Sequence, residues 1–327
     1  MLRIIGLNVD IFNTYVVPAG QISKGRGMKF LQLMRPQHWT KNVFVFAALV
    51  FGRKLAEPSA VGRAVGGFVC FCLAASAVYI FNDIIDRRTD RLHPVKRKRP
   101  IAAGQVSVGS AAVLSALCAA AAVIGSLMLG RDFTIVVSMY IVLIVLYSLL
   151  LKRIMILDCI VISAGFCLRA IAGAEVVNVF ISPWLVVCTF ALCLFLAFSK
   201  RRSELAQLGE DGESFRKALA DYNPELLAHA VDVTSGLAVV CFLLYAMDDL
   251  TLERFGTNNL VYTTPLVLYC IFRFSALMQK GAYSEPVQLI LTDWPFQIGL
   301  VLWVLACVGI IYGGRLGIGP GAAGASV

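Results

Sequence analysis

Charged residues are scarce in this chain. Asp, Glu, Lys and Arg make up only 15% of its 327 residues, and 59% of the residues are hydrophobic. Soluble domains carry about a quarter of charged residues, and the mean hydropathy of +0.79 is correspondingly high. Residues 1–30 also lack a basic start, an apolar core and a small-residue cleavage site in the order that a signal peptide requires. The composition excludes an ordinary soluble domain and indicates a membrane protein.

The sequence also lacks a metal-binding cysteine motif. It has ten cysteines, but none of them form a CxxC pair. All ten fall within proposed membrane spans, where a free cysteine behaves as a small hydrophobic residue. We therefore interpret the cysteines as packing residues and predict neither a disulfide framework nor a cysteine metal site.

Long apolar windows recur along the chain and approach the roughly 20 residues that a membrane-spanning helix needs. They lie at 64–82, 100–130, 133–151, 176–199, 232–247 and 294–314, with shorter windows at 38–55, 154–175 and 257–279. No polar linker of useful length divides them. We predict an all-α membrane protein with a bundle of about nine transmembrane helices in one catalytic domain at 35–316. A cytoplasmic or interfacial segment at 1–34 and a flexible tail at 317–327 would flank it.

The basic residues are distributed unequally between the two faces of this bundle. Most of the 29 Lys and Arg residues fall in the N-terminal segment and in the loops that follow the even-numbered spans. By the positive-inside rule this face is cytoplasmic. We expect a multi-pass protein of the cytoplasmic (inner) membrane. The topology accounts for the net charge of +9 without a nucleic-acid partner.

An acidic cluster, NDIIDRRTD, ends the second predicted span on the cytoplasmic side. Asp83, Asp86 and Asp90 would stack on one face of a continuing helix, with Asn82 beside them. Stacked carboxylates at a membrane helix end are costly unless a cation neutralises them. Mg²⁺ shared with a diphosphate meets this need, because the ion prefers oxygen ligands. We predict Asn82, Asp83, Asp86 and Asp90 as catalytic residues and Mg²⁺ ligands.

A basic group follows the acidic cluster directly. Its cations suit phosphate oxygens beside a carboxylate-bound metal. The group consists of Arg91, His93, Lys96, Arg97, Lys98 and Arg99. For Arg97 and Lys98 an ordinary solvated loop remains the alternative. His93 precedes Pro94 and therefore lies in a non-helical segment, so we interpret it as shaping the site rather than binding metal.

NDIIDRRTD resembles the first aspartate-rich motif, NDxxDxxxD, of the UbiA-type intramembrane prenyltransferase superfamily. The resemblance implies a bundle of nine transmembrane helices with a Mg²⁺-dependent diphosphate site at the cytoplasmic face. The segments DRLHPVKRKRPIAAG, RPQHWTKNVFVFA, YSLLLKRIMILD, GFCLRAIAGA and SKRRSEL are further similar to the decaprenyl-phosphate phosphoribosyltransferase branch. That branch transfers 5-phosphoribose from phosphoribosyl diphosphate to a polyprenyl phosphate, releases pyrophosphate and supplies cell-envelope precursors.

The sequence departs from a typical prenyl-donor site at the end of the sixth span. Typical superfamily members carry a second DxxxD motif there, whereas this chain reads Lys200, Arg201, Arg202, Ser203, Glu204. This cationic cluster suits phosphate groups better than a second Mg²⁺, although basic residues at a span boundary also set orientation. The first alternative is a prenyltransferase with a prenyl diphosphate donor and an aromatic or lipid acceptor. A transporter, with charges lining a pathway, is the second.

The remaining polar residues near the predicted cytoplasmic face complete the substrate site. The predicted substrate-binding residues are Lys41, Asn42, Arg91, His93, Lys96, Arg99, Tyr147, Lys152, Asp158, Arg169, Lys200, Arg201 and Glu204. Arg169 lies deep in its span and needs a partner, so pairing with Glu175 or another acid stays open beside substrate contact. Phosphoribosyl diphosphate, a polyprenyl phosphate and the bilayer are the expected partners, and a homo-oligomer is left open.

Overall fold

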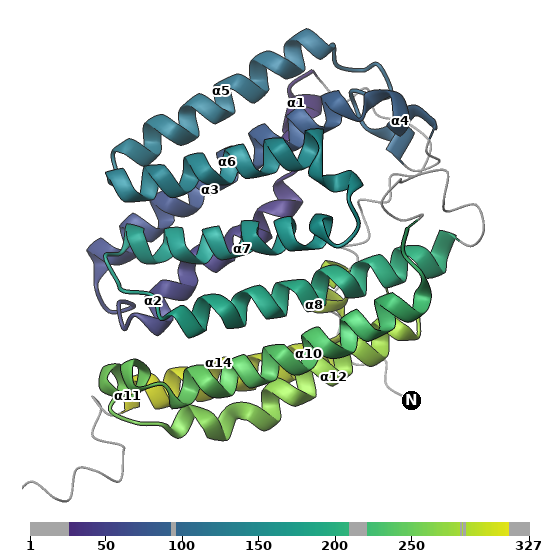
Figure 1. The fold of residues 1–327 in the computed structure, drawn as a ribbon. Helices are drawn as coiled ribbons and strands as arrows, with labels where there is room; N and C mark the ends of the chain where they lie inside the picture. Colours follow the sequence, from purple (N-terminus) through teal and green to yellow (C-terminus); the bar gives the residue numbers. More distant parts are fainter. Residues whose placement is uncertain (1–25, 93–95, 209–220, 282, 284–285, 314–327) are drawn as a thin grey trace, which may run out of the picture.

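The structure is a computed structural model that describes residues 26–92, 96–208, 221–281, 283 and 286–313. Its long helices lie roughly side by side (Figure 1) and are α3 (Pro58–Ile85), α5 (Val108–Leu127), α6 (Arg131–Leu149), α7 (Leu157–Val176), α8 (Pro183–Leu208), α10 (Pro224–Met247), α12 (Thr264–Gln279) and α14 (Trp294–Gly313). Shorter elements join them: α1 (Arg26–Met34), η3 (Pro36–Phe46), α2 (Ala47–Phe51), α4 (Arg87–Leu92), η4 (Lys96–Lys98), η5 (Leu151–Arg153), α11 (Asp249–Phe255), η7 (Asn259–Thr263) and α13 (Pro286–Thr292). The all-α prediction is confirmed, and no strand occurs in the described ranges.

Eight helical segments within the described residues are long and apolar enough to cross a membrane. The expected span at 38–55 differs, because it is built from the eleven-residue 3₁₀ helix η3 and the five-residue α2. A 3₁₀ helix rises about 2.0 Å per residue, against about 1.5 Å in an α-helix, so these two elements together reach about 30 Å. That length equals the hydrocarbon thickness of a bilayer. The segment therefore matches a ninth crossing in length while using fewer residues.

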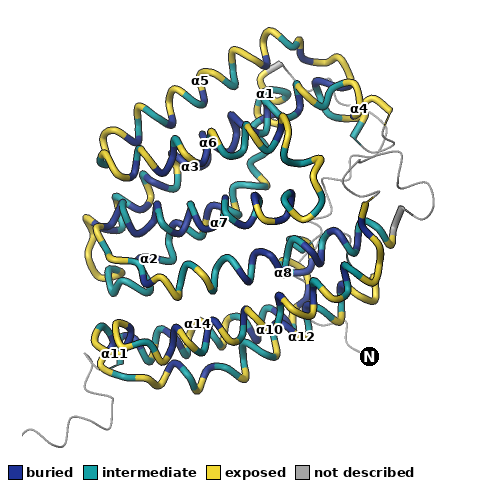
Figure 2. Tube along the Cα trace, in the orientation of Figure 1, coloured by how far each residue is buried: buried dark blue, intermediate teal, exposed yellow. Residues whose placement is uncertain are grey.

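The helices divide into buried and lipid-facing members. The central helices α3 and α7 are largely buried (Figure 2), whereas α5 lies at one edge and exposes Leu117, Ile124 and Leu127. Large exposed apolar side chains suit a helix surface that meets lipid. Small residues let the central elements approach closely: a Cβ at Gly173 of α7 would lie only 2.2 Å from the carbonyl oxygen of Val45 in η3.

Arginines at the end of the bundle opposite α4 bind main-chain carbonyl groups. Arg53 donates to the carbonyl oxygens of Arg254 (2.8 Å), Phe255 (2.9 Å) and Ile311 (2.9 Å), and Arg63 joins the ends of α5 and α7 in the same way. Helix ends leave carbonyls without intrahelical partners, and these guanidinium groups satisfy them. Arg53 and Arg63 on this face thus have structural partners.

The structure tests the prediction about the cysteines but not the prediction about the domain bounds. All ten cysteines are free, and most are buried, as a packing role predicts. The single domain at 35–316 stays a prediction. The segment predicted at 1–34 includes α1, while the tail at 317–327 lies outside the described residues.

Candidate active site

The acidic cluster lies where α3 ends and α4 begins. Asp86 is the C-terminal cap of α3, and the backbone N–H of Asp90 donates to its carbonyl oxygen at 2.8 Å. The chain therefore continues almost helically from Asn82 to Asp90. Asp83 and Asp90 are buried, with 3% and 4% of their surfaces exposed. The local sequence thus places four oxygen-bearing side chains within about two helical turns.

Two of the carboxylates share one arginine. Nη1 of Arg99 lies 3.0 Å from Oδ1 of Asp83 and 2.7 Å from Oδ2 of Asp90. Arg99 follows η4, so the turn after α4 returns a guanidinium to the face that carries Asp83 and Asp90. Burial raises the pKa of Asp90 above its ordinary value, and the charge of Arg99 opposes this shift. Arg99 therefore offsets part of the free-energy cost of burying the carboxylates of Asp83 and Asp90.

The other two side chains of the cluster share a lysine. Nζ of Lys152 lies 2.5 Å from Oδ1 of Asp86 and 3.3 Å from Oδ1 of Asn82, and Nδ2 of Asn82 donates to Oδ2 of Asp86 at 3.0 Å. Lys152 belongs to η5, between α6 and α7. The three aspartates consequently divide into two groups, each with its own cation, instead of the single stack that their spacing predicts.

A third cation, Arg35, was missed by reasoning from the sequence. Its Nη2 lies 2.5 Å from Oδ1 of Asp83, and its guanidinium lies 5.5 Å from the ring centroid of Tyr79. Arg35 has φ 53° and ψ 62°, a left-handed conformation that is uncommon for a residue other than glycine. Arg35 opens RPQHWTKN, but an arginine before a span fits an orientation signal equally well.

A second ionic cluster joins α7, α8 and Tyr222, two residues before α10. Nε of Arg201 donates to Oδ2 of Asp158 at 2.8 Å, and its Nη1 donates to Glu204. The hydroxyl of Tyr222 donates to Oδ1 of Asp158 at 2.9 Å, and burial raises the pKa of this tyrosine. Nζ of Lys200 is 3.9 Å from Glu204. Glu204, the one acid at the position of a second aspartate motif, and Asp158 of α7 are therefore both paired with cations.

Tyr222 is the second residue that the sequence did not reveal. It precedes an apolar helix, and a tyrosine at a membrane interface is usually an ordinary belt residue. Here its hydroxyl also accepts a hydrogen bond from the N–H of Ile156 at 2.7 Å. Tyr222 therefore connects the start of α7 with the start of α10.

Comparison with known proteins identifies the family. Residues 42–292 match the model of the UbiA prenyltransferase family. The chain belongs to this family. It is therefore a multi-pass membrane transferase, and the predicted superfamily is confirmed.

Curated relatives of this UbiA family chain span most of its length. The decaprenyl-phosphate phosphoribosyltransferase of Mycolicibacterium smegmatis is 32% identical over 292 residues, which cover 86% of this chain and 92% of the relative. A protein of the same name from Corynebacterium glutamicum is 31% identical over 295 residues, 86% of each chain. A solved UbiA homologue from Archaeoglobus fulgidus, bound to GPP and Mg²⁺, has a TM-score of 0.67 at 19% identity. It covers 86% of this chain and 99% of its own, and shows the shared fold.

The oxygen ligands of this UbiA family site suit Mg²⁺ chemically, because the cluster consists of three carboxylates and an amide. Within the described residues, however, no three Asp, Glu, His or Cys side chains are grouped closely enough to hold a metal. Asp83, Asp86 and Asp90 instead bind Arg35, Arg99 and Lys152. These carboxylates fit an ion that arrives with phosphate groups. Arg35, Arg99 and Lys152 would then pair with the phosphate oxygens and leave the carboxylates free for the ion.

Arg169 and Asn42 lie in the interior. Nε of Arg169 donates to Oδ1 of Asn42 at 2.8 Å, its Nη2 donates to the hydroxyl of Tyr140 at 2.8 Å, and its guanidinium faces the rings of Tyr140 and Phe166. Within the described part of the chain Arg169 makes no ion pair. The alternative of a pairing with Glu175 is therefore wrong, because neutral oxygens and aromatic faces stabilise this buried cation.

The structure distributes the other predicted substrate-binding residues around the same end of the bundle. Arg91 donates through Nε to the carbonyl oxygen of Ala102 at 3.0 Å. Lys41, Lys96 and Tyr147 are half-buried, and Arg97 and Lys98 are exposed, as a solvated loop would have them. His93 lies outside the described residues. Contact with substrate stays a prediction for all of them.

Proposed function

We propose that this UbiA family chain transfers 5-phosphoribose from phosphoribosyl diphosphate to a polyprenyl phosphate and releases pyrophosphate. Relatives at 31% and 32% identity are named for this activity with decaprenyl phosphate. The observation that carries the proposal is the position of the second aspartate motif, which holds three cations and a single acid, Glu204, and this acid is paired with Arg201. Such a group suits phosphates better than a second Mg²⁺ for a prenyl diphosphate.

The first cluster provides the groups that a phosphorylated donor needs. Asp83 and Asp86, with Asn82 and Asp90, would hold Mg²⁺, which neutralises charge on the diphosphate as it leaves. Arg99 and two further cations, Arg35 and Lys152, already lie at hydrogen-bond distance from these carboxylates. They are placed to turn to phosphate oxygens when the donor binds. This arrangement supports a donor that is rich in phosphate groups.

The reaction needs positioning more than proton transfer. A phosphate oxygen of the lipid attacks the anomeric carbon of ribose while the bond from that carbon to the diphosphate oxygen breaks, and pyrophosphate takes the electron pair. The attacking phosphate is already an anion near neutral pH, so no general base is required. The basic side chains hold the two anionic substrates in line and stabilise the charge that develops on the leaving group.

We place this site at the cytoplasmic side of the inner membrane. Most basic residues flank the spans at the α4 end, which carries the acidic cluster and the second ionic cluster described above. The positive-inside rule assigns such an end to the cytoplasm. The polyprenyl chain would extend between the apolar helices into the bilayer, and only its phosphate would reach the cluster.

The test uses purified full-length protein in lipid nanodiscs with Mg²⁺, decaprenyl phosphate and ribose-labelled phosphoribosyl diphosphate. We expect label in the organic phase that is lost with EDTA and in Asp83→Asn. The matched control is Asp132→Asn, an exposed aspartate at the opposite end of the bundle, which should retain activity. Absence of lipid label with folded protein would overturn the proposal, and label transferred from a prenyl diphosphate would replace it with the prenyltransferase alternative.

A further inference from the structure

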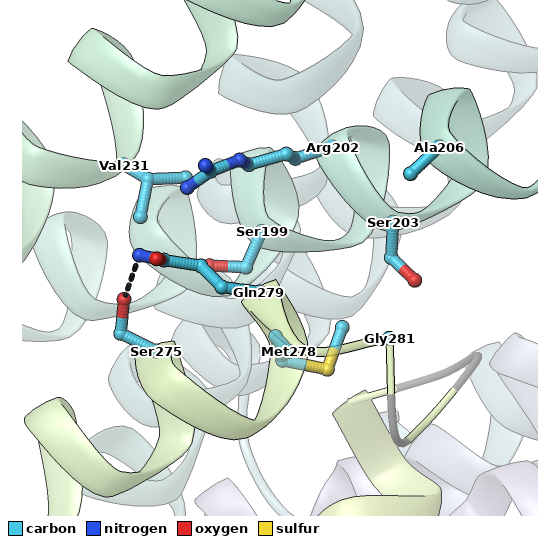
Figure 3. Close-up of a pocket in the computed structure, with 9 residues that line it drawn as sticks. All are labelled: Ser199, Arg202, Ser203, Ala206, Val231, Ser275, Met278, Gln279 and Gly281. Carbon is cyan, nitrogen blue, oxygen red and sulfur yellow. Dashed lines mark hydrogen bonds between the residues drawn. The ribbon is translucent and has the colours of Figure 1, made fainter.

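A pocket with polar and apolar lining residues lies outside both ionic clusters. It has a volume of about 140 Å³ and opens between α8, α10 and α12 (Figure 3). Its lining residues are Ser199, Arg202, Ser203, Ala206, Val231, Ser275, Met278, Gln279 and Gly281. Polar groups come from two helices, since Ser199 and Arg202 belong to α8 whereas Ser275 and Gln279 belong to α12.

The helical register of α8 places this pocket on a different side of the helix from the ion pair between Arg201 and Asp158. Positions 199, 202, 203 and 206 recur at intervals of three and four residues and therefore share one helix face. That face lines the pocket, beside Val231 of α10. Arg201 points to another side of α8, where it binds Asp158 of α7. The pocket and the ion pair thus lie on different sides of the same helix.

Ser199 supplies a buried donor without a partner. Only 3% of this residue is exposed, and its hydroxyl makes no hydrogen bond to any residue that the structure describes. Other hydroxyls in these helices donate to the carbonyl four residues earlier, as Ser148, Ser163 and Thr189 do at 2.8 to 2.9 Å. Buried polar groups in native proteins are nearly always paired. An unpaired hydroxyl that lines a pocket therefore points to a bound group with acceptor oxygens.

Arg202 gives the pocket its positive charge. The side chain is half-buried, and no hydrogen bond or ion pair joins it to another described residue. Figure 3 shows its guanidinium and the Gln279 amide in the same part of the pocket; that amide donates to Oγ of Ser275 at 3.1 Å. The described residues that line the pocket include no Asp or Glu. An arginine with no acidic partner attracts an anion, and its planar fork suits phosphate.

We propose that this pocket binds a phosphate group, with Arg202 pairing to its charge and Ser199 donating to one of its oxygens. Its volume is sufficient for one phosphate or several waters. The phosphate can belong to the headgroup of an anionic lipid, because the pocket lies at the α4 end of the helices, or to a free inorganic ion. Arg202 belongs to the cationic cluster noted in the sequence, but the inference uses none of the residues predicted to bind the metal or the substrates of the transfer.

The test measures ligand-dependent stabilisation, because a ligand that binds the folded protein raises its thermal midpoint. Full-length protein in phosphatidylcholine nanodiscs receives either inorganic phosphate in solution or phosphatidic acid in the disc. We compare wild type, Arg202→Gln, Ser199→Ala and Arg153→Gln. Arg153 is an exposed arginine of η5 at the same end and controls for the loss of one cation. Ser199→Ala keeps the charge and is expected to fold, because the hydroxyl that it removes has no partner.

We expect the midpoint of wild type and Arg153→Gln to rise with the ligand. The half-saturating concentration should be about tenfold higher in Arg202→Gln, the effect of losing one charge-assisted hydrogen bond, and should also rise in Ser199→Ala. A response to phosphatidic acid alone would assign the phosphate to a lipid headgroup, and a response to inorganic phosphate would assign it to a free anion. An equal response in wild type and Arg202→Gln would place binding at Arg35, Arg99 and Lys152 and overturn the proposal, as would no response.

Discussion

Arg35 and Asp83 are 48 residues apart in the sequence, yet Nη2 of the arginine lies 2.5 Å from Oδ1 of the aspartate. The contact ties the segment before η3 to the end of α3, where the acidic cluster begins. Arg35 holds this position with a backbone φ of 53°. Strained residues of this kind persist where the surrounding structure determines them, and they gather at functional sites.

Two substitutions of Arg35 distinguish the effect of its charge from the effect of its left-handed backbone conformation. Arg35→Gln and Arg35→Gly both remove the ion pair, but only glycine adopts the left-handed conformation without steric cost. We expect Arg35→Gly to exceed Arg35→Gln in free energy of unfolding by about 1 kcal/mol. Chemical denaturation of the two variants in the same detergent measures the difference. Equal stability, or a more stable glutamine variant, would contradict the assigned strain.

The pair of Asp158 and Arg201 should behave as a structural unit. Both residues are buried, and Asp158→Asn weakens the charge-assisted hydrogen bonds from Arg201 and Tyr222 while Glu204 still pairs with the arginine, so it should cost about 2 kcal/mol of folding free energy. The control Asp132→Asn, at an exposed position, should change it by less than about 0.5 kcal/mol. A folded Asp158→Asn of normal stability with weakened donor binding would instead favour the predicted substrate contact.

Gly173 should not tolerate a side chain. Its Cβ would approach the carbonyl oxygen of Val45 to 2.2 Å, so Gly173→Ala forces η3 away from α7. We expect a loss of about 2 kcal/mol or more in folding free energy, as in other overpacked cores. Gly236→Ala is the matched change in α10, where nothing lies within 4 Å of the added carbon. It should be neutral or stabilising by about 0.5 to 1 kcal/mol, because alanine is the better helix former.

Asp293 should make stability depend on acidity. Nε and Nη2 of Arg273 lie 2.6 and 2.9 Å from its carboxylate oxygens, and this pairing lowers the pKa of Asp293 below 3.8. A carboxyl group whose folded pKa is depressed stabilises the fold above its unfolded pKa and loses this contribution as pH falls through the folded value. Asp293→Asn should therefore lower the thermal midpoint at neutral pH. The difference from wild type should shrink below pH 3.8, and a constant difference would contradict the assignment.

The sequence by itself determined the membrane character, the helical class and the place of the acidic cluster. These follow from local patterns: apolar windows match the bilayer thickness, and Asn82 through Asp90 lie close together in any helical conformation. The acidic motif also indicated the family, and the match over residues 42–292 confirmed it. Local spacing further predicted that carboxylates at this position need cations.

Only the tertiary structure decided which cations those are. Arg35, Arg99 and Lys152 reach the cluster from three separate segments, and Arg169 meets Asn42 across 127 residues of sequence. Spacing along one helix contains no information about such partners, because helix packing sets which end meets which loop. Packing likewise left the hydroxyl of Ser199 without a partner among the described residues beside Arg202, since this depends on how closely neighbouring helices approach.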